Sequence, residues 1–251
     1  MLLGYPLETY EIRMKRKLDN LIMQVFGAPF GRPFAPPFGP RLAVVSGDWW
    51  EGATFANQPK GAASAAASYV NLANPGTYDL SNGTAYPAFN TATGWTFDGD
   101  SSQYLLIGAG TGPVLSGAVS YLVRVNMNRS ASNIPILGTV DSLANFNTRI
   151  LATTQLHTIR MQTTAIGTGA TAISTEKVIG ATYTAAGAFI MYLNGASDGT
   201  GTNNQTITGD TDAIGRFSTT YAFGVISALG VWESVLTPAE VARRSTAMLA
   251  I

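Results

Sequence analysis

The first 26 residues carry hydrophobic side chains at helical spacing. Leu7, Met14 and Leu21 recur at intervals of seven residues, and the charged side chains occupy the opposite face. Gly27 follows the last turn of this pattern and is a typical helix terminator. We therefore predict an amphipathic helix in residues 1–26, which either packs on its own domain or docks on a partner.

Residues 27–48 form a second segment with a different pattern. The stretch GAPFGRPFAPPFGPR (27–41) holds five prolines and three phenylalanines, and such proline density favours an extended backbone. We predict an anchoring arm that contacts a neighbouring subunit or another protein, through Phe30, Arg32, Phe34, Phe38 and Arg41. The alternative is that the arm wraps its own domain and covers a sheet edge.

From Trp49 onward, short apolar runs alternate with glycine, threonine, asparagine and serine. Residues 118–125 (AVSYLVRV) place every second side chain on one apolar face, as a half-buried strand does. Further strands are expected in residues 146–153, 156–162, 188–195 and 221–232, and Asn194–Gly195 is a strong hairpin signal. Many short strands with regular turns predict a two-sheet antiparallel β-sandwich, or jelly roll, in residues 49–251.

The last fifteen residues return to a helical pattern. Thr237 is placed as the N-cap, Pro238 as the first helical residue and Glu240 as the third, which is a capping box. Val235 and Val241 are placed to form a hydrophobic staple around this cap. Residues 61–68 (GAASAAAS) are small and apolar, and we predict an edge or loop there rather than a helix.

The composition narrows the functional classes. The 251 residues contain 46% hydrophobic and only 12% charged residues, with a formal net charge of zero and no cysteine. A neutral chain lacks the basic field that nucleic-acid binding needs, and the absence of cysteine excludes disulfides and thiolate chemistry. The sequence shows no secretory signal and no apolar run long enough to span a membrane.

Three segments resemble a known fold family. GWTFDGDSSQYLLIG (94–108), FIMYLNGASDG (189–199) and FGVISALGVWESVLTPAEVAR (223–243) occur in the order seen in concanavalin A-like lectin/glucanase domains of the laminin-G-like type. The resemblance covers roughly residues 60–251 and implies a sandwich with a buried aromatic core. We expect that core to contain Trp95, Phe97, Tyr104, Leu106, Phe189, Met191, Leu193, Phe223 and Trp232. Residues 58–80 more loosely resemble uncharacterised lectin-like proteins of phages and prophages.

The residues that family members use to cleave β-glucans are missing. Those enzymes resemble one another in a Glu-x-Asp-x-x-Glu strand, which places two carboxylates on one face, and no such spacing occurs here. His157, the one histidine, lies within a predicted strand and is interpreted as an ordinary strand residue. We therefore predict a protein that is not an enzyme and has no catalytic residues.

Glycan binding needs an exposed aromatic ring beside a few amides. The residues that offer these groups are Trp49, Trp50, Tyr86, Asn203, Asn204 and Gln205. The alternative for Trp49 and Trp50 is packing, where the arm joins the sandwich. No cofactor is expected, and weak candidates for a Ca²⁺ site are the loop acids Asp98, Asp100, Asp210 and Asp212. Asp98 and Asp100 are more simply explained by an Asx turn.

These observations lead to two functional hypotheses. The first is a structural virion protein, such as a capsid decoration or tail protein, held by residues 1–45 to other virion proteins or to copies of itself. Such a protein is made in the host cytoplasm without a signal peptide and resides in the virion. The second is a carbohydrate-binding receptor-recognition or adhesin module at a fibre tip or cell surface, with surface glycans as partners.

Overall fold

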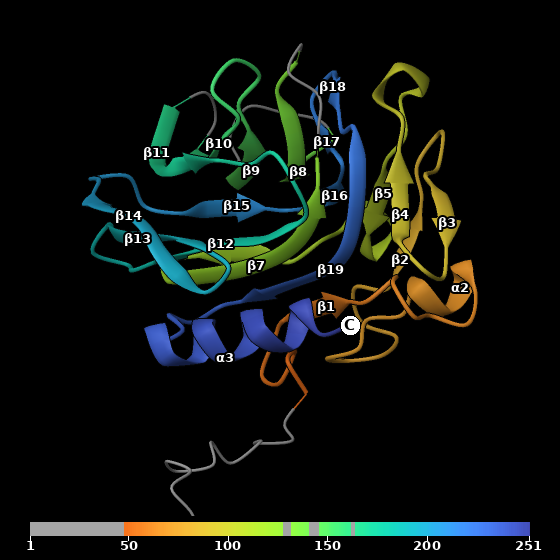
Figure 1. The fold of residues 1–251 in the computed structure, drawn as a ribbon, viewed down its shortest axis with the longest axis horizontal. Helices are drawn as coiled ribbons and strands as arrows, with labels where there is room; N and C mark the ends of the chain where they lie inside the picture. The colour runs from red at the N-terminus through yellow and green to blue at the C-terminus, as the bar shows by residue number, and fades with distance from the viewer. Residues whose placement is uncertain (1–47, 128–131, 141–145, 162–163) are drawn as a thin grey trace, which may run out of the picture. The chain divides into compact units, whose positions relative to one another are not determined.

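The computed structural model describes residues 48–127, 132–140, 146–161 and 164–251 (Figure 1). The predicted N-terminal helix lies outside these residues. So does the arm as far as residue 47, with Phe30, Arg32, Phe34, Phe38 and Arg41.

Two antiparallel sheets form the described part of the chain (Figure 1). Sheet A runs β14 (Ala196–Thr202), β13 (Ala188–Leu193), β12 (Lys177–Tyr183), β7 (Val119–Asn126), β19 (Gly224–Trp232), β4 (Gly94–Phe97) and β3 (Ala88–Asn90), with β1 (Phe55–Asn57) paired to β19. Sheet B runs β11 (Thr164–Ala172), β10 (Leu156–Met161), β9 (Phe146–Ile150), β8 (Ile134–Gly138), β16 (Ala213–Ile214), β5 (Leu105–Ile107) and β2 (Leu80–Asn82).

Shorter elements connect and flank these sheets. Two small ribbons pair β6 (Val114–Ser116) with β15 (Thr208–Asp210), and β17 (Arg216–Phe217) with β18 (Thr220–Tyr221). The helical elements are α2 (Ala65–Ser68), η1 (Gly99–Ser101), η2 (Gly108–Gly110) and α3 (Pro238–Leu249). The all-β sandwich with a short C-terminal helix is therefore confirmed. Within the described ranges, no helix has the length and apolar character needed to cross a membrane.

The main core lies between the two sheets. Val119, Tyr121, Val123 and Val125 of β7 all point into it, as their alternation predicts. Each fully buried aliphatic side chain contributes about 1.5–3 kcal/mol. The indole N–H of buried Trp95 is satisfied because it donates to Ser68 Oγ at 2.9 Å.

The predicted core list is correct for most members but wrong in three places. Phe223 is only half-buried and belongs to neither apolar cluster. On β5 the fully buried side chains are Leu105 and Ile107, whereas Leu106 is only half-buried. The strand therefore runs in the opposite phase, which two adjacent leucines do not reveal. Trp232 is buried on the other face of sheet A, beneath α3.

The helix α3 covers part of the outer face of sheet A (Figure 1). Thr237 is its N-cap and forms the predicted capping box with Glu240, and Pro238 occupies the first turn. The predicted staple is wrong by one residue. Val235 is 43% exposed, whereas Leu236 is buried in the same cluster as Val241, because Leu236 directly precedes the cap and turns inward.

Local turn signals are also borne out, with one exception. Asn194 and Gly195 join β13 to β14 with φ of 49° and 84°, as a type I′ hairpin turn requires. A Cβ on Gly195 would lie 2.9 Å from Ala242 Cα, so the glycine also lets α3 approach the turn. The exception is residues 61–68, predicted as an edge or loop, in which Ser64 caps the single helical turn α2 by accepting a hydrogen bond from Ala67 N at 3.1 Å.

Candidate functional site

The strands β7, β19 and β4 are neighbours in sheet A. Part of their outer face is left uncovered by the other elements. Val225 is opposite Thr96 on one side and opposite Asn126 on the other. Side chains of successive strand residues point to opposite faces. Since Trp95, Phe97 and Val125 point into the core, Thr96 and Asn126 point outward. The three residues thus form a row across three strands.

Two adjoining hollows lie along this row. The larger, of about 470 Å³, is lined by Thr96, Phe97, Asp98, Asn126, Phe223, Gly224 and Val225. The smaller, of about 150 Å³, is lined by Lys60, Ala92, Thr93, Asn126, Glu176 and Val225. Because the hollows share Asn126 and Val225, we describe them together as the sheet-A groove.

Asp98 and Phe223 form one end of the groove. The Asp98 carboxylate caps η1, accepting hydrogen bonds from Asp100 N at 3.2 Å and Ser101 Oγ at 2.7 Å. This confirms the predicted Asx turn and fixes the orientation of the carboxylate. The Phe223 ring lies against Gly99, where any Cβ would clash with it. The end of the groove therefore presents an acceptor beside a half-buried aromatic ring.

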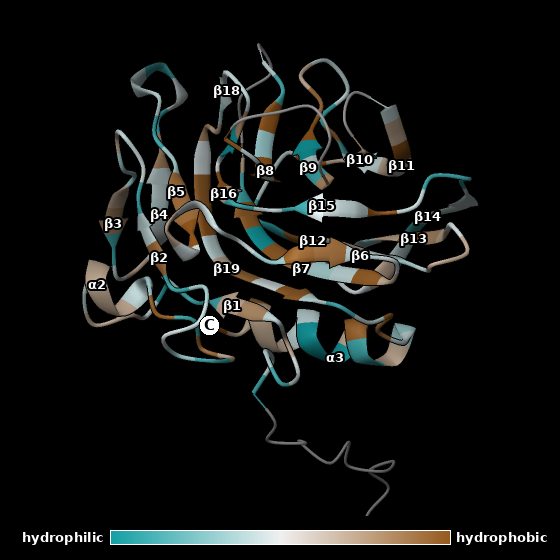
Figure 2. Ribbon diagram, turned by 180° about the vertical axis from the view of Figure 1, so that it is seen from behind, coloured by the Kyte–Doolittle hydropathy of each residue, from teal (hydrophilic) through white to brown (hydrophobic). Residues whose placement is uncertain are grey.

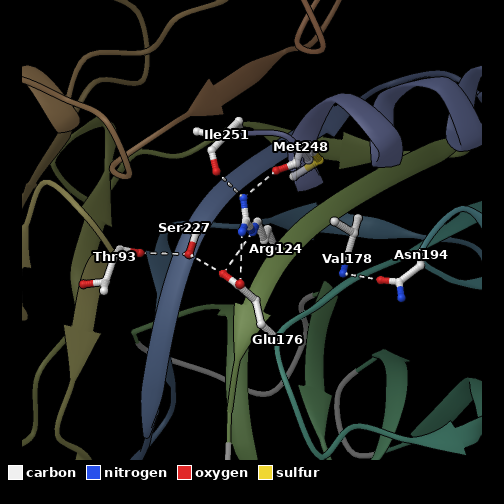
Figure 3. Close-up of polar contacts among 8 residues, drawn as sticks. All are labelled: Thr93, Arg124, Glu176, Val178, Asn194, Ser227, Met248 and Ile251. Carbon is white, nitrogen blue, oxygen red and sulfur yellow. Dashed lines mark hydrogen bonds and ion pairs between the residues drawn. The ribbon is translucent and has the colours of Figure 1, made fainter.

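Glu176 forms the other end and is held by buried Arg124 (Figure 3). Arg124 Nε and Nη2 donate to the two carboxylate oxygens at 2.9 and 3.0 Å, while Nη1 donates to the Met248 and Ile251 carbonyls at 2.8 Å. Figure 3 also shows Ser227 donating to the Thr93 carbonyl. One arginine thus joins the groove to the end of α3.

Electrostatics keep Glu176 ionised. The hydrogen bond from Arg124 lowers the pKa of Glu176, and the nearby positive charges of Arg124 and Lys60 lower it further. A glycoside hydrolase needs one carboxylic acid whose raised pKa keeps it protonated. Glu176 is therefore suited to accept hydrogen bonds and unsuited to donate a proton to a leaving group.

His157 is sealed inside the core. Its Nε2 shares hydrogen bonds with the Tyr121 hydroxyl and with Thr148 Oγ1, the latter at 3.0 Å. Burial lowers the pKa of His157 to about 3, so the ring is neutral at ordinary pH. The interpretation of His157 as an ordinary strand residue is confirmed.

The glycan-binding residues expected from the sequence do not converge. Tyr86 is 61% exposed and lies two residues before β3, whereas Asn203, Asn204 and Gln205 follow β14, at the opposite edge of sheet A. None of the six residues lines the sheet-A groove. One groove containing both Tyr86 and the amides is therefore excluded.

The tryptophan pair follows the packing alternative. Trp49 is 4% exposed, and its Nε1 donates to Gln58 Oε1 at 2.9 Å. Trp50 meets its ring edge-on, with the centroids 5.4 Å apart. Since both belong to the apolar cluster beneath α3, the Trp49 ring has no open face for a sugar.

The four candidate calcium ligands lie in two places. Asp98 and Asp100 belong to the η1 turn, whereas Asp210 ends β15 and Asp212 follows two residues later. Asp212 is buried and accepts a hydrogen bond from Val140 N at 2.9 Å. Within the described part of the chain, no three His, Cys, Asp or Glu side chains gather into a group that could hold a metal ion.

Sequence reasoning missed most of the groove. Asn126 ends a strand, and Glu176 stands just before one, which are ordinary positions for polar residues. Thr96 and Val225 read as the outward members of alternating strands. These residues form a site because the pairing register places them side by side on three strands. The three strands lie far apart in the sequence, so no local sequence pattern predicts this arrangement.

No protein-family model and no curated protein sequence matches the chain. Solved structures do. Domain 4 of AbnA, a GH43 extracellular arabinanase from Geobacillus stearothermophilus, solved in complex with arabinotriose, has 16% identity and a TM-score of 0.52, covering 77% of this chain and 98% of that domain.

Botulinum neurotoxin domains are also similar in fold. The receptor-binding domain of botulinum neurotoxin D has 9% identity and a TM-score of 0.54 over 80% of this chain and 54% of its own. The serotype D ligand-binding domain in complex with N-acetylneuraminic acid has 11% identity and a TM-score of 0.53, over 78% and 51%. This chain matches only about half the length of the toxin chains. At such low identity the likeness shows a shared β-sandwich fold.

Proposed function

We propose that the chain is a non-catalytic carbohydrate-binding module whose sheet-A groove holds an oligosaccharide. The observation that carries the proposal is the row of Thr96, Val225 and Asn126 across three strands, with Asp98 and Phe223 at one end and Glu176 at the other. An open groove of this kind receives an elongated polar ligand without closing over it.

The chemistry of the lining fits sugar hydroxyls. Asp98 and Glu176 supply carboxylate acceptors, whose hydrogen bonds are about twice as strong as neutral ones. The Asn126 amide and the Thr96 hydroxyl can both donate and accept, and the Phe223 ring gives an apolar surface for the C–H face of a sugar. Structural neighbours solved with arabinotriose and with N-acetylneuraminic acid support this class of ligand.

We further propose that residues 1–45 attach the module to a larger assembly. The pattern of prolines and phenylalanines in residues 27–41 favours attachment to other virion proteins or to copies of the same chain. On this proposal the protein is made in the host cytoplasm and resides in the virion, on the capsid or tail. A receptor-recognition role at a fibre tip uses the same groove, and electron micrographs of particles labelled on this chain would distinguish the two locations.

The groove is tested by glycan-array screening of the full chain, followed by calorimetry with any hit. We expect Asn126→Ala to weaken binding about tenfold, since losing one hydrogen bond to a ligand costs about 1.4 kcal/mol. Asn204→Ala and Gln205→Ala, exposed at the opposite sheet edge, are the matched controls and should bind normally. The same incubations should release no reducing sugar.

Two results would contradict the proposal. If Tyr86→Ala or the two controls abolish binding while Asn126→Ala does not, the ligand occupies a sheet edge instead of the groove. If reducing ends appear and a single acid-to-amide change such as Asp98→Asn stops them, the module is an enzyme.

A further inference from the structure

Two arginines lie side by side on the outer face of sheet B, away from the sheet-A groove. In the β9–β10 pair, Arg149 is opposite Thr158 and Arg160 is opposite Asn147. The neighbouring side chains of Phe146, Ile150, Ile159 and Met161 enter the core, so Arg149 and Arg160 point outward. They are therefore diagonal neighbours on one face, a spacing within reach of long side chains.

Both guanidinium groups are partly buried, and no ion pair joins either of them to another of the described residues. The Nε atoms of Arg149 and Arg160 are buried and have no hydrogen-bond partner. Across the next strands, Arg149 faces Pro135 of β8 and Arg160 faces Ala165 of β11, neither of which carries a charge. The ion pair found among the described residues joins Arg124 to Glu176, in sheet A.

Arg124, Arg216 and Arg244, by contrast, each have partners for part of the guanidinium group. Arg244 Nη1 donates to the Trp49 and Glu51 carbonyls at 2.7 and 2.9 Å, although its Nε also lacks a partner. Arg124 donates to a carboxylate and two carbonyls. Arg216 lies 4.6 Å from the centre of the Tyr104 ring and donates to the Ser218 carbonyl at 2.8 Å. Two like charges side by side are unusual in a chain with only 12% charged residues, and no carboxylate of the described residues offsets their repulsion.

Both arginines are positively charged at neutral pH. Burial, and then the neighbouring charge of Arg160, lower the pKa of Arg149 to about 10, and burial lowers the pKa of Arg160. Arginine keeps its proton at neutral pH despite such shifts. Removing positive charge from water without a partner is unfavourable. An arriving anion would relieve that cost, and arginine binds planar oxyanions through two parallel hydrogen bonds.

We infer that Arg149 and Arg160 form a receptor for one oxyanion, the carboxylate or sulfate group of a ligand. The two guanidinium groups hold it between β9 and β10, and its charge supplies the counter-ion that the described residues do not provide. This site is separate from the sheet-A groove, so its failure would leave the groove proposal untouched.

The test compares anions on the full-length protein at constant ionic strength. Sodium sulfate and sodium glucuronate should each raise the melting temperature above that in sodium chloride, whereas neutral methyl glucoside should not. A rise with only one anion assigns the site to that group. In Arg149→Gln/Arg160→Gln the affinity for that anion should fall at least tenfold, while Arg243→Gln, which changes a half-buried arginine on α3, should behave like wild type.

Two further variants keep the result interpretable. Arg149→Lys/Arg160→Lys retains both charges but lacks the two-pronged geometry, and it should bind more weakly than wild type while folding normally. The second variant is Asp141→Asn. Asp141 is the one acid in the internal segments outside the described residues, so this variant tests whether its carboxylate competes with the anion. If anions bind only after that change, or stabilise wild type and the double glutamine variant equally, the inference is wrong.

Discussion

At the scale of single residues, the buried His157 makes the stability of the fold depend on pH. Its ring is neutral in the folded chain because burial lowers its pKa from 6.5 to about 3. Between these values the unfolded chain binds a proton that the folded chain excludes, so stability rises with pH across this window. On acidification below pH 6.5 the protein should lose about 1.4 kcal/mol per pH unit through this one residue.

Urea denaturation at pH 7, 6 and 5 measures this slope. The pKa values of Glu176 and Glu240 are lowered from 4.5, so those carboxylates destabilise the fold only below this pH range. His157→Gln cannot take up the proton and should show a flat profile between pH 7 and 5, although it is less stable throughout. An equal slope in both proteins would assign the pH dependence to another group.

Burial of individual residues was predictable where alternation is unambiguous and not elsewhere. The alternating residues of β7 fix their own faces, because one phase is apolar and the other contains Ser120 and Arg124. On β5 both Leu105 and Leu106 suit a core, and the partners β2 and β16 decide that Leu105 is buried. Trp49 looks like a sugar platform until α3, far along the chain, packs against it.

At the scale of elements, α3 depends on its cap. Thr237 Oγ1 accepts from Glu240 N at 3.3 Å, and Glu240 Oε2 accepts from Thr237 N at 2.7 Å. Thr237→Ala leaves the first turn without its side-chain acceptor and should cost about 1 kcal/mol. For a domain of this size that lowers the melting temperature by about 2–4 °C.

Thr246→Ala is the control on the same helix. Thr246 is exposed, and its hydroxyl donates to the Ala242 carbonyl at 2.9 Å inside α3. Alanine has the higher helix propensity there, so the melting temperature should stay the same or rise. Thermal melts followed by circular dichroism compare the two variants, and equal melting temperatures would show that the cap does not stabilise the fold.

Elements with local signals were predictable, and their arrangement was not. The Asn194–Gly195 turn and the capping box each depend on a few adjacent residues, so the sequence predicts both correctly. The order of strands in sheet A depends on pairings such as β7 with β12 and β19, which join residues far apart in the chain. The sheet-A groove exists only because the strands pair in that order, so the sequence did not predict it. The sequence indicated instead aromatic and amide residues, which lie at separate edges of the sheet.

At the scale of the whole molecule, the two proposed sites use different faces of one sandwich. The sheet-A groove lies where α3 leaves the outer face of sheet A uncovered, and the arginine pair lies on the outer face of sheet B. Figure 2 shows hydrophilic residues in β9. The interior of the sandwich thus serves stability, and both proposed binding sites lie on its outer faces.

The final prediction concerns residues 1–45. Gly47–Ile251 form a compact unit of their own, and the described core runs from Trp49 to Met248 within it. We expect deletion of residues 1–45 to leave a cooperative melt close to that of the full chain but to abolish joining of the particle or oligomer. Prolines restrict the arm before it binds, which reduces the entropy lost on docking, and each buried phenylalanine contributes about 1.5–3 kcal/mol.

A full-length variant with Phe30, Phe34 and Phe38 changed to serine separates the apolar contacts from the length of chain. It keeps all the prolines and both Arg32 and Arg41, so it should melt normally and yet assemble as poorly as the deletion. Sedimentation and thermal melts of the three proteins test this directly. If the deletion assembles normally, the arm is not the anchor. If both altered proteins instead lose their cooperative melt, the arm wraps its own sandwich and covers a sheet edge, because only that arrangement makes the three rings part of the fold.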